Sequence, residues 1–313
     1  MTYLRRSVWF CCTLLILFSL CTACSTTTML EDGETDTGTG QKNANYEEMA
    51  VLAVEQVLKD SLRNPESLQI HSASIEEDFY EDDSVYFCTA IVDYSAQNGF
   101  GGYNRDTIKN YVEIVKADGT ITELDEAAYF NRRTKAQFGD GLCSIGESIP
   151  MQFICSEDKY SQLRSKIIVS GDKYHTFTYK NGEREISYVT NLGKLEGTAT
   201  FYFYSKNEKI YQINFFWSDG QSFYDGTNAY TLGTEYIATL EDVYALTEKI
   251  DNALKIPHGE IRETTETYFH DYECRWNLTE GIFVKLSWTV NDIDGSIGHI
   301  QLLLCNEINS TAE

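Results

Sequence analysis

The sequence predicts an α+β fold with two small domains, each an antiparallel sheet that carries a helix on one face. Apolar residues recur at helical spacing in two stretches, 45–62 and 240–254. Alternating apolar and polar residues, most regular from Ile282 to Val290, indicate strands with one buried face. These strands follow one another without intervening helices, which favours antiparallel over parallel pairing.

The first thirty residues read as an export signal. Two arginines, Arg5 and Arg6, precede an apolar stretch from Val8 to Leu20. This stretch has the length of a signal-peptide core and is shorter than the roughly 20 apolar residues of a membrane span. An uncleaved N-terminal helix is the alternative.

The class of signal is indicated by the five residues at the end of this stretch, Leu20-Cys21-Thr22-Ala23-Cys24. They resemble the lipobox of bacterial lipoproteins, where a small residue precedes the cysteine that is lipidated. The position of Cys21 usually holds Leu in that family. The resemblance implies a signal peptide at 1–23 and lipid attachment at Cys24.

Residues 24–44 are polar and rich in Thr and Gly, so we expect a disordered tether. Cleavage after residue 23 removes two of the 25 basic residues and none of the 48 acidic ones, which leaves a net charge of −25. Such a chain repels nucleic acid and anionic lipid head groups. We therefore expect no nucleic-acid partner, contact with the membrane through the lipid anchor, and a location at the cell membrane facing the extracytoplasmic side.

We place the N-terminal domain at 45–155. Its helix ends at Asn64-Pro65, because Pro lacks an N–H group and disfavours helix at the residue before it. A short strand near 68–70 and a long strand at 85–94 follow. A hairpin then joins 107–116 to 120–124 at Asp118-Gly119.

The connection before that hairpin is the best candidate ligand loop, and its possible contact residues are Gln97, Asn98, Phe100, Tyr103 and Arg105. In a functional interpretation the glycines admit a partner, the two rings offer stacking surface and the arginine offers a charge. In a structural interpretation, which we prefer, the glycines at 99, 101 and 102 take positive φ and Phe100 fills the core.

The stretch from Asn64-Pro65 through Gln97-Asn98-Gly99-Phe100-Gly101 also carries a resemblance. It is similar to a small helix-plus-sheet domain of exported bacterial proteins of unknown function. The resemblance covers about 80 residues. It implies a fold and no chemistry.

We place the C-terminal domain at 156–309. Strands at 198–204 and 209–217 flank a turn, and Thr239 with Asp242 forms a helix N-cap signal. Three further strands, about 266–276, 280–290 and 297–305, complete the sheet. Between the domains, Pro150 and the glycines from Gly139 to Gly146 suggest loops, and a short helix is expected from about 156 to 168.

Chemistry-bearing residues form no recognisable catalytic, metal or nucleotide motif, so we expect no catalytic residues, no metal and no cofactor. Cys143 with Cys155, and Cys274 with Cys305, are conceivable disulfides, with buried thiols the preferred alternative. His270 and His299 are able to approach across the sheet, although histidines with ordinary single partners are preferred. The acidic run at 76–83 and the segment 291–295 read as turns rather than calcium sites.

Aromatic residues make up 13% of the chain, and Tyr202, Tyr204, Tyr211 and Phe216 are the ones that we expect to matter if a sheet face is exposed. The expected function is a membrane-anchored extracytoplasmic lipoprotein that binds a protein or an envelope glycan without catalysis. The alternative is a cell-envelope hydrolase with an unrecognised active site.

Overall fold

The structure is a computed structural model that describes residues 40–76, 80–82, 84–146, 148–167, 173–265 and 268–311. The expected signal peptide, Cys24 and the tether up to residue 39 lie outside the described residues. Helices and antiparallel sheets make up the described part, which confirms the α+β class. Within it, no helix is both long and apolar enough to cross a membrane.

Internal contacts divide the chain into two compact units, one ending at Glu123 and the other beginning at Leu124. This division differs from the boundary that the sequence suggests between 155 and 156. The reason is the helix at 126–146, which packs against elements of the second unit and so belongs to it.

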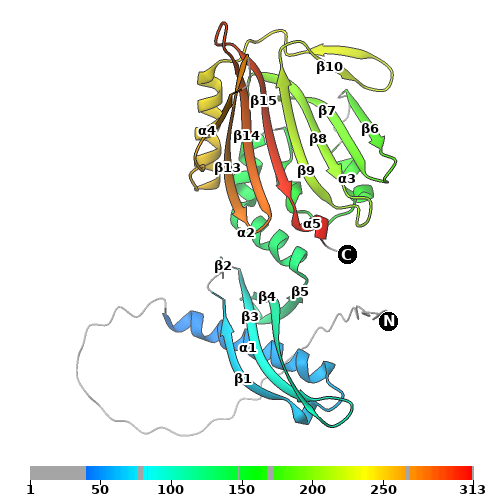
Figure 1. Ribbon diagram of the computed structural model, residues 1–313, viewed down its shortest axis with the longest axis vertical. Coiled ribbons are helices and arrows are strands. Elements are labelled where there is room, and N and C mark those ends of the chain that lie inside the picture. The colour runs from blue at the N-terminus through cyan, green and yellow to red at the C-terminus, as the bar shows by residue number, and fades with distance from the viewer. Residues whose placement is uncertain are drawn as a thin grey trace, which may run out of the picture. The chain divides into compact units, whose positions relative to one another are not determined.

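The first unit is a helix laid on an antiparallel sheet with the strand order β1-β3-β4-β5, and β2 pairs with β3 (Figure 1). In chain order its elements are α1 (Gly40–Ser61), η1 (Pro65–Ser67), β1 (Gln69–Ile75), β2 (Tyr80–Glu81), β3 (Val85–Gln97), β4 (Tyr103–Val115) and β5 (Thr120–Leu124).

The core of the first unit lies between α1 and the sheet. Ala50, Val54 and Leu58 form the buried stripe of the helix. They meet the face of β3 that carries Tyr86 and Cys88, as the alternation in the sequence predicts. The helix begins at Gly40 rather than at residue 45, so the expected tether is too long by its last five residues. Those residues are mostly polar and gave no apolar periodicity.

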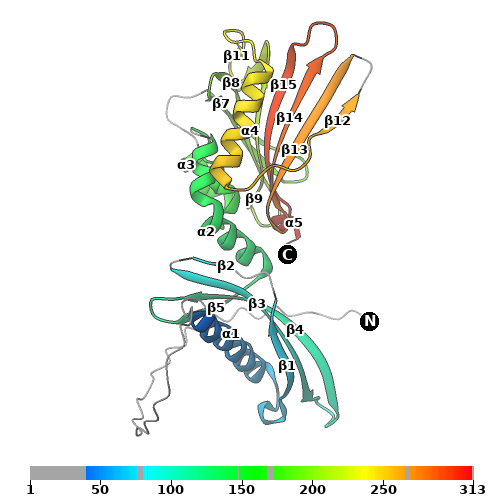
Figure 2. The ribbon, with the colours of Figure 1, turned by 90° about the vertical axis from the view of Figure 1, so that its left-hand side faces the viewer.

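The second unit is an eight-stranded antiparallel sheet with the strand order β12-β13-β14-β15-β9-β8-β7-β6. Helices α2, α3 and α4 lie on one side of it (Figure 2). Its elements are α2 (Glu126–Gly146), η2 (Met151–Cys155), α3 (Tyr160–Ile167), β6 (Tyr174–Thr178), β7 (Arg184–Leu192), β8 (Leu195–Phe203), β9 (Ile210–Ser218), β10 (Gln221–Tyr224), β11 (Ala229–Leu232), α4 (Leu240–Leu254), β12 (Arg262–Thr265), β13 (Phe269–Thr279), β14 (Ile282–Asn291), β15 (Ile297–Asn306) and α5 (Ile308–Thr311).

Most of the elements that the sequence predicts in this unit are confirmed. Thr239 caps α4 in a capping box, because its hydroxyl accepts from the Asp242 N–H while the Asp242 carboxylate accepts from the Thr239 N–H. The alternating residues of β14 from Ile282 to Trp288 are buried. Strands β6 and β7 and the β10–β11 hairpin were missed.

The loop expected around Gly139–Gly146 is wrong, because α2 runs through all of it. Gly141 is needed for the packing of α2 on another helix and not for a turn. A Cβ atom on Gly141 would lie less than 3 Å from the carbonyl oxygen of Ala253 in α4. The missing side chain is what lets the two helices approach each other.

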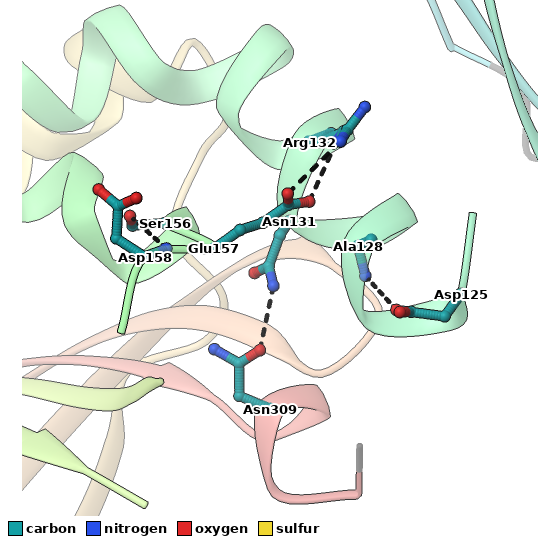
Figure 3. Close-up of polar contacts among 8 residues, drawn as sticks. All are labelled: Asp125, Ala128, Asn131, Arg132, Ser156, Glu157, Asp158 and Asn309. Atoms are coloured by element: carbon teal, nitrogen blue, oxygen red, sulfur yellow. Dashed lines mark hydrogen bonds and ion pairs between the residues drawn. The ribbon is translucent and has the colours of Figure 1, made fainter. Parts of the chain in front are cut away.

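Three buried asparagines join α2 to the end of the sheet, and all three are 0% exposed. The amide of Asn306 donates to Asn131 Oδ1 at 2.6 Å and to the Ile154 carbonyl at 2.9 Å. Asn131 donates in turn to Asn309 Oδ1 at 3.0 Å (Figure 3), and Asn309 donates to the Ile210 carbonyl at 2.6 Å. This network fixes the first turns of α2 on the sheet. Close by on the surface, Arg132 pairs with Glu157.

The five cysteines of the folded part are all free thiols, so neither conceivable disulfide forms. Burial raises the pKa of Cys88, Cys155 and Cys274 to about 12, and that of the half-buried Cys305 to about 11. Cys143 alone among them is exposed.

A maleimide reagent should therefore modify Cys143 first, because attack requires an accessible thiolate. Peptide mapping after a short exposure measures the order of labelling. Cys143→Ser should remove the fast-reacting site and leave the other four protected. Equal labelling of Cys88 or Cys274 in the native chain would show that these thiols are not enclosed as described.

Candidate functional site

The candidate ligand loop of the first unit is a hairpin tip, residues 98–102 between β3 and β4, and we call it the tip loop. Asn98 organises it. The Asn98 Oδ1 atom accepts from the N–H groups of Phe100 and Gly102, both at 3.0 Å. The Asn98 N–H donates to the Gly102 carbonyl at 2.7 Å, and Gly101 N–H donates back to the Asn98 carbonyl at 3.0 Å. The tip loop is thus fixed by hydrogen bonds to one side chain and its own backbone.

Gln97 holds the base of the tip loop through hydrogen bonds. Its side-chain amide donates to the Gly101 carbonyl at 3.0 Å, and its side-chain oxygen accepts from Asn64 Nδ2 at 2.9 Å. The Gln97 N–H also donates to Ser67 Oγ at 3.0 Å. The Asn64-Pro65 segment and η1, which follow α1, therefore hold the base of the tip loop, and this connects two motifs that the sequence showed separately.

The structural interpretation of Phe100 is wrong. Its ring is fully exposed, at 102% of the reference accessibility, and does not fill the core. Among the three glycines only Gly101 takes a positive φ, +89°, so the turn requires one glycine and not three. A loop that is closed by Asn98 needs no aromatic plug, and this leaves Phe100 free to face solvent.

The five predicted contact residues divide into two roles. Gln97 and Asn98 hold the loop and Arg105 pairs with Asp93 through two hydrogen bonds, 3.0 and 2.5 Å. Phe100 and Tyr103 point to solvent, with Tyr103 57% exposed. The five residues surround a protruding tip, so they do not line a cavity.

A second candidate surface lies on the second unit. Phe203 meets Tyr160 of α3 with ring centroids 4.9 Å apart, so Phe201 and Phe203 face the helices. Tyr202 alternates with them and faces the opposite side, which we call the outer face. There the tyrosine cluster gathers from β6 to β9 and from the turns that join them. Its members are Phe177, Tyr179, Tyr202, Tyr204 and Tyr211.

The rings of the tyrosine cluster form two groups, and the rings within each group contact one another. Tyr211 lies between Tyr204 and Tyr202, with centroid distances of 4.2 and 6.0 Å. Phe177 and Tyr179 meet edge to face at 4.9 Å and are 46% and 38% exposed. The cluster thus presents two groups of partly exposed rings on one face of the sheet.

Carboxylates orient the hydroxyl groups of this cluster. Tyr179 donates to Glu185 Oε2 at 2.5 Å, and this bond is the main reason why its pKa is raised. Burial, and then the charge of Glu183, raise the pKa of Tyr211 to about 12. Burial and Glu185 also raise the pKa of Tyr202. The hydroxyls of Tyr179, Tyr202 and Tyr211 therefore stay protonated near neutral pH and remain hydrogen-bond donors.

The sequence pointed to three of the five cluster residues. It missed Phe177 and Tyr179, because the segment 173–182 was not recognised as a strand and its turn. The signal was present in the alternation His175, Phe177, Tyr179. Phe216, the fourth expected residue, instead stacks on His299 at 5.7 Å, on the neighbouring strand β15.

His270 and His299, whose approach across the sheet is the less favoured alternative, lie on opposite faces. His270 pairs with Val290 and His299 with Thr289, and adjacent residues of β14 point to opposite sides. His270 contacts Glu263 at 2.5 Å and Asp292 at 2.7 Å, and His299 bonds to Thr289 at 2.7 Å. His270 is thus held by two carboxylates and His299 by one hydroxyl, and each is satisfied without the other, which is the preferred expectation.

Other polar groups of interest serve turns. Asp82 accepts from the N–H groups of Ser84 and Val85, while residues 77–79 and 83 of the acidic run lie outside the description. The segment 291–295 closes a β-turn with Gly295 at φ +69°. Among the described residues no group of His, Cys, Asp or Glu is placed to hold a metal ion.

A shallow pocket of about 560 Å³ lies between β6 and the β10–β11 turn, lined by residues that include His175 and Asp225. The Asp225 carboxylate already accepts from Thr227 N–H, Asn228 N–H and the Tyr230 hydroxyl. These three hydrogen bonds give the Asp225 carboxylate a structural role in the turn.

Comparison of the chain with protein-family models, with curated proteins and with solved structures finds no match.

Proposed function

We propose that the chain is an exported bacterial lipoprotein, anchored through Cys24 to the extracytoplasmic side of the cell membrane, that binds a protein or glycan of the envelope. The anchor is supported by the lipobox-like segment before Cys24 and by the polar stretch that follows it. The strongly acidic chain needs such an anchor, because its charge opposes adsorption to anionic lipids.

The observation that carries the binding role is the tyrosine cluster on the outer face. Rings that pack on one another on a sheet and its turns lose little freedom when a partner docks. Tyrosine combines apolar area with a hydroxyl donor, a combination enriched at recognition surfaces. Next to the rings, Glu185 and the amides of Asn214 and Gln301 supply hydrogen-bonding groups on the same face.

A hydrolase would need a nucleophile, a base and a pocket in one place. In the described chain the exposed Cys143 lies on α2, while the shallow pocket lies at β6 and contains His175. These features are carried by different elements, and the binding role therefore has the better support.

A photo-cross-linking amino acid at position 177 tests the binding role in intact envelopes. We expect one discrete cross-linked adduct at position 177. This adduct should be lost in Tyr211→Ala, which removes the ring between Tyr202 and Tyr204 in the tyrosine cluster. The matched control places the same amino acid at Tyr244, which is 57% exposed on α4 and belongs to the helix side of the unit. Identical adducts at both positions, or none at 177, would contradict the proposal.

A further inference from the structure

The tip loop carries an exposed aromatic ring that contributes nothing to the core. Phe100 is fully exposed, and Tyr103 beside it is 57% exposed. Single exposed apolar residues are common on proteins. Here, however, the ring stands at the end of a hairpin whose turn is closed by hydrogen bonds from Asn98 and Gln97. The structure presents the ring in a fixed position.

Charge distinguishes the tip from the rest of the chain. Residues 94–105 contain no acidic residue, although the whole chain carries 48. Arg105 neutralises Asp93 through their ion pair. The guanidinium of Arg63 lies beside Gly99, since a Cβ atom on that glycine would be 3.7 Å from it. Asp106 follows Arg105 directly, so with Arg63 the tip is close to neutral on an acidic protein.

The tip is therefore better suited to contact a lipid surface than the acidic rest of the chain is. An aromatic ring partitions into the apolar part of the interface, while Tyr and Arg side chains place their polar ends at the level of the head groups. Arg63 also attracts anionic lipid head groups, and this attraction extends over about 8–10 Å at physiological salt.

We propose that Phe100 inserts into the membrane surface and gives the first unit a second contact with the bilayer, with Tyr103 and Arg63 at head-group level. This inference rests on the proposed anchor at Cys24, which supplies the high local concentration that a single ring needs. The chain from Cys24 to Gly40 can extend to at most about 55 Å. The 22-residue helix α1 is about 33 Å long. The anchor therefore leaves the tip within reach of the lipid.

The test uses the full lipidated chain with Phe100→Trp, reconstituted into phosphatidylcholine–phosphatidylglycerol vesicles through its own anchor. The native Trp217, Trp276 and Trp288 are at most 3% exposed and form a shielded background. Fluorescence of the added tryptophan is measured with iodide in the water and with brominated acyl chains in the bilayer. Tyr244→Trp, at a 57% exposed position on α4 of the second unit, is the matched control.

We expect the tryptophan at position 100 to shift its emission to the blue, to lose iodide quenching and to gain quenching by bromine, with no such change at position 244. Unchanged iodide quenching at position 100 would overturn the inference and leave the proposed function intact. Protection from iodide without bromine quenching would also overturn it, because the ring would then be docked on protein. A chain that carries no lipid on Cys24 would overturn both proposals.

Discussion

Replacing Asn306 with alanine should lower the free energy of unfolding of the second unit by about 4 kcal/mol. The side chain is 0% exposed and serves three groups at once: Asn131 Oδ1, the Ile154 carbonyl and the N–H of Asn309. Alanine would leave all three buried without this partner. Each lost partner costs roughly 1–3 kcal/mol when water cannot replace it.

Tryptophan fluorescence during urea unfolding measures this effect selectively, because the three tryptophans after residue 23 all lie in the second unit. Asn277→Ala is the matched control. Asn277 is an exposed asparagine of β13 in the same sheet, and its loss should change the midpoint little. Equal stability of Asn306→Ala and Asn277→Ala would mean that water enters the asparagine network and that the network does not hold α2 on the sheet.

Gly141→Ala should destabilise the second unit by about 3 kcal/mol, against the direction that helix propensity alone predicts. Alanine in the interior of a helix is normally better than glycine by about 1 kcal/mol. At position 141 the added methyl group would collide with the backbone carbonyl of Ala253, which cannot rotate away as a side chain would. To relieve the collision, α2 and α4 would have to separate and lose packing.

Gly139 provides a control on the same helix. A Cβ atom there meets only Lys135 Cγ at 3.6 Å, an ordinary contact. Gly139→Ala should therefore raise the unfolding midpoint while Gly141→Ala lowers it, as measured by the same fluorescence experiment. Two shifts of the same sign would contradict the close approach of the helices.

The contrast between these glycines shows where sequence reasoning reaches its limit. Regular alternation located β14, and the Thr239–Asp242 pair located the start of α4, because both signals are local. Gly139, Gly141 and Gly146 suggested a loop because glycine weakens a helix. Gly141 instead contacts Ala253, more than a hundred positions away, and no local pattern contains that contact. The asparagine network depends on equally distant partners.

The candidate surfaces were predictable to a similar extent. The sequence indicated the loop at 97–105 and the tyrosines of β8 and β9. It placed the Phe100 ring in the core, which is wrong. Composition does not show that the Asn98 side chain already closes the turn with hydrogen bonds. Exposure follows from the whole set of contacts, and only the folded chain provides that set.

Intact-mass analysis of the protein extracted from membranes tests the central claim, the anchor at Cys24, most directly. We expect a chain that begins at Cys24 and is heavier than its polypeptide by the mass of attached acyl chains, and we expect Cys24→Ala to lack this added mass. A membrane-bound wild-type protein with the mass of the unmodified 313-residue chain, 35.7 kDa, would contradict the account, since the N-terminal segment would then be an uncleaved helix.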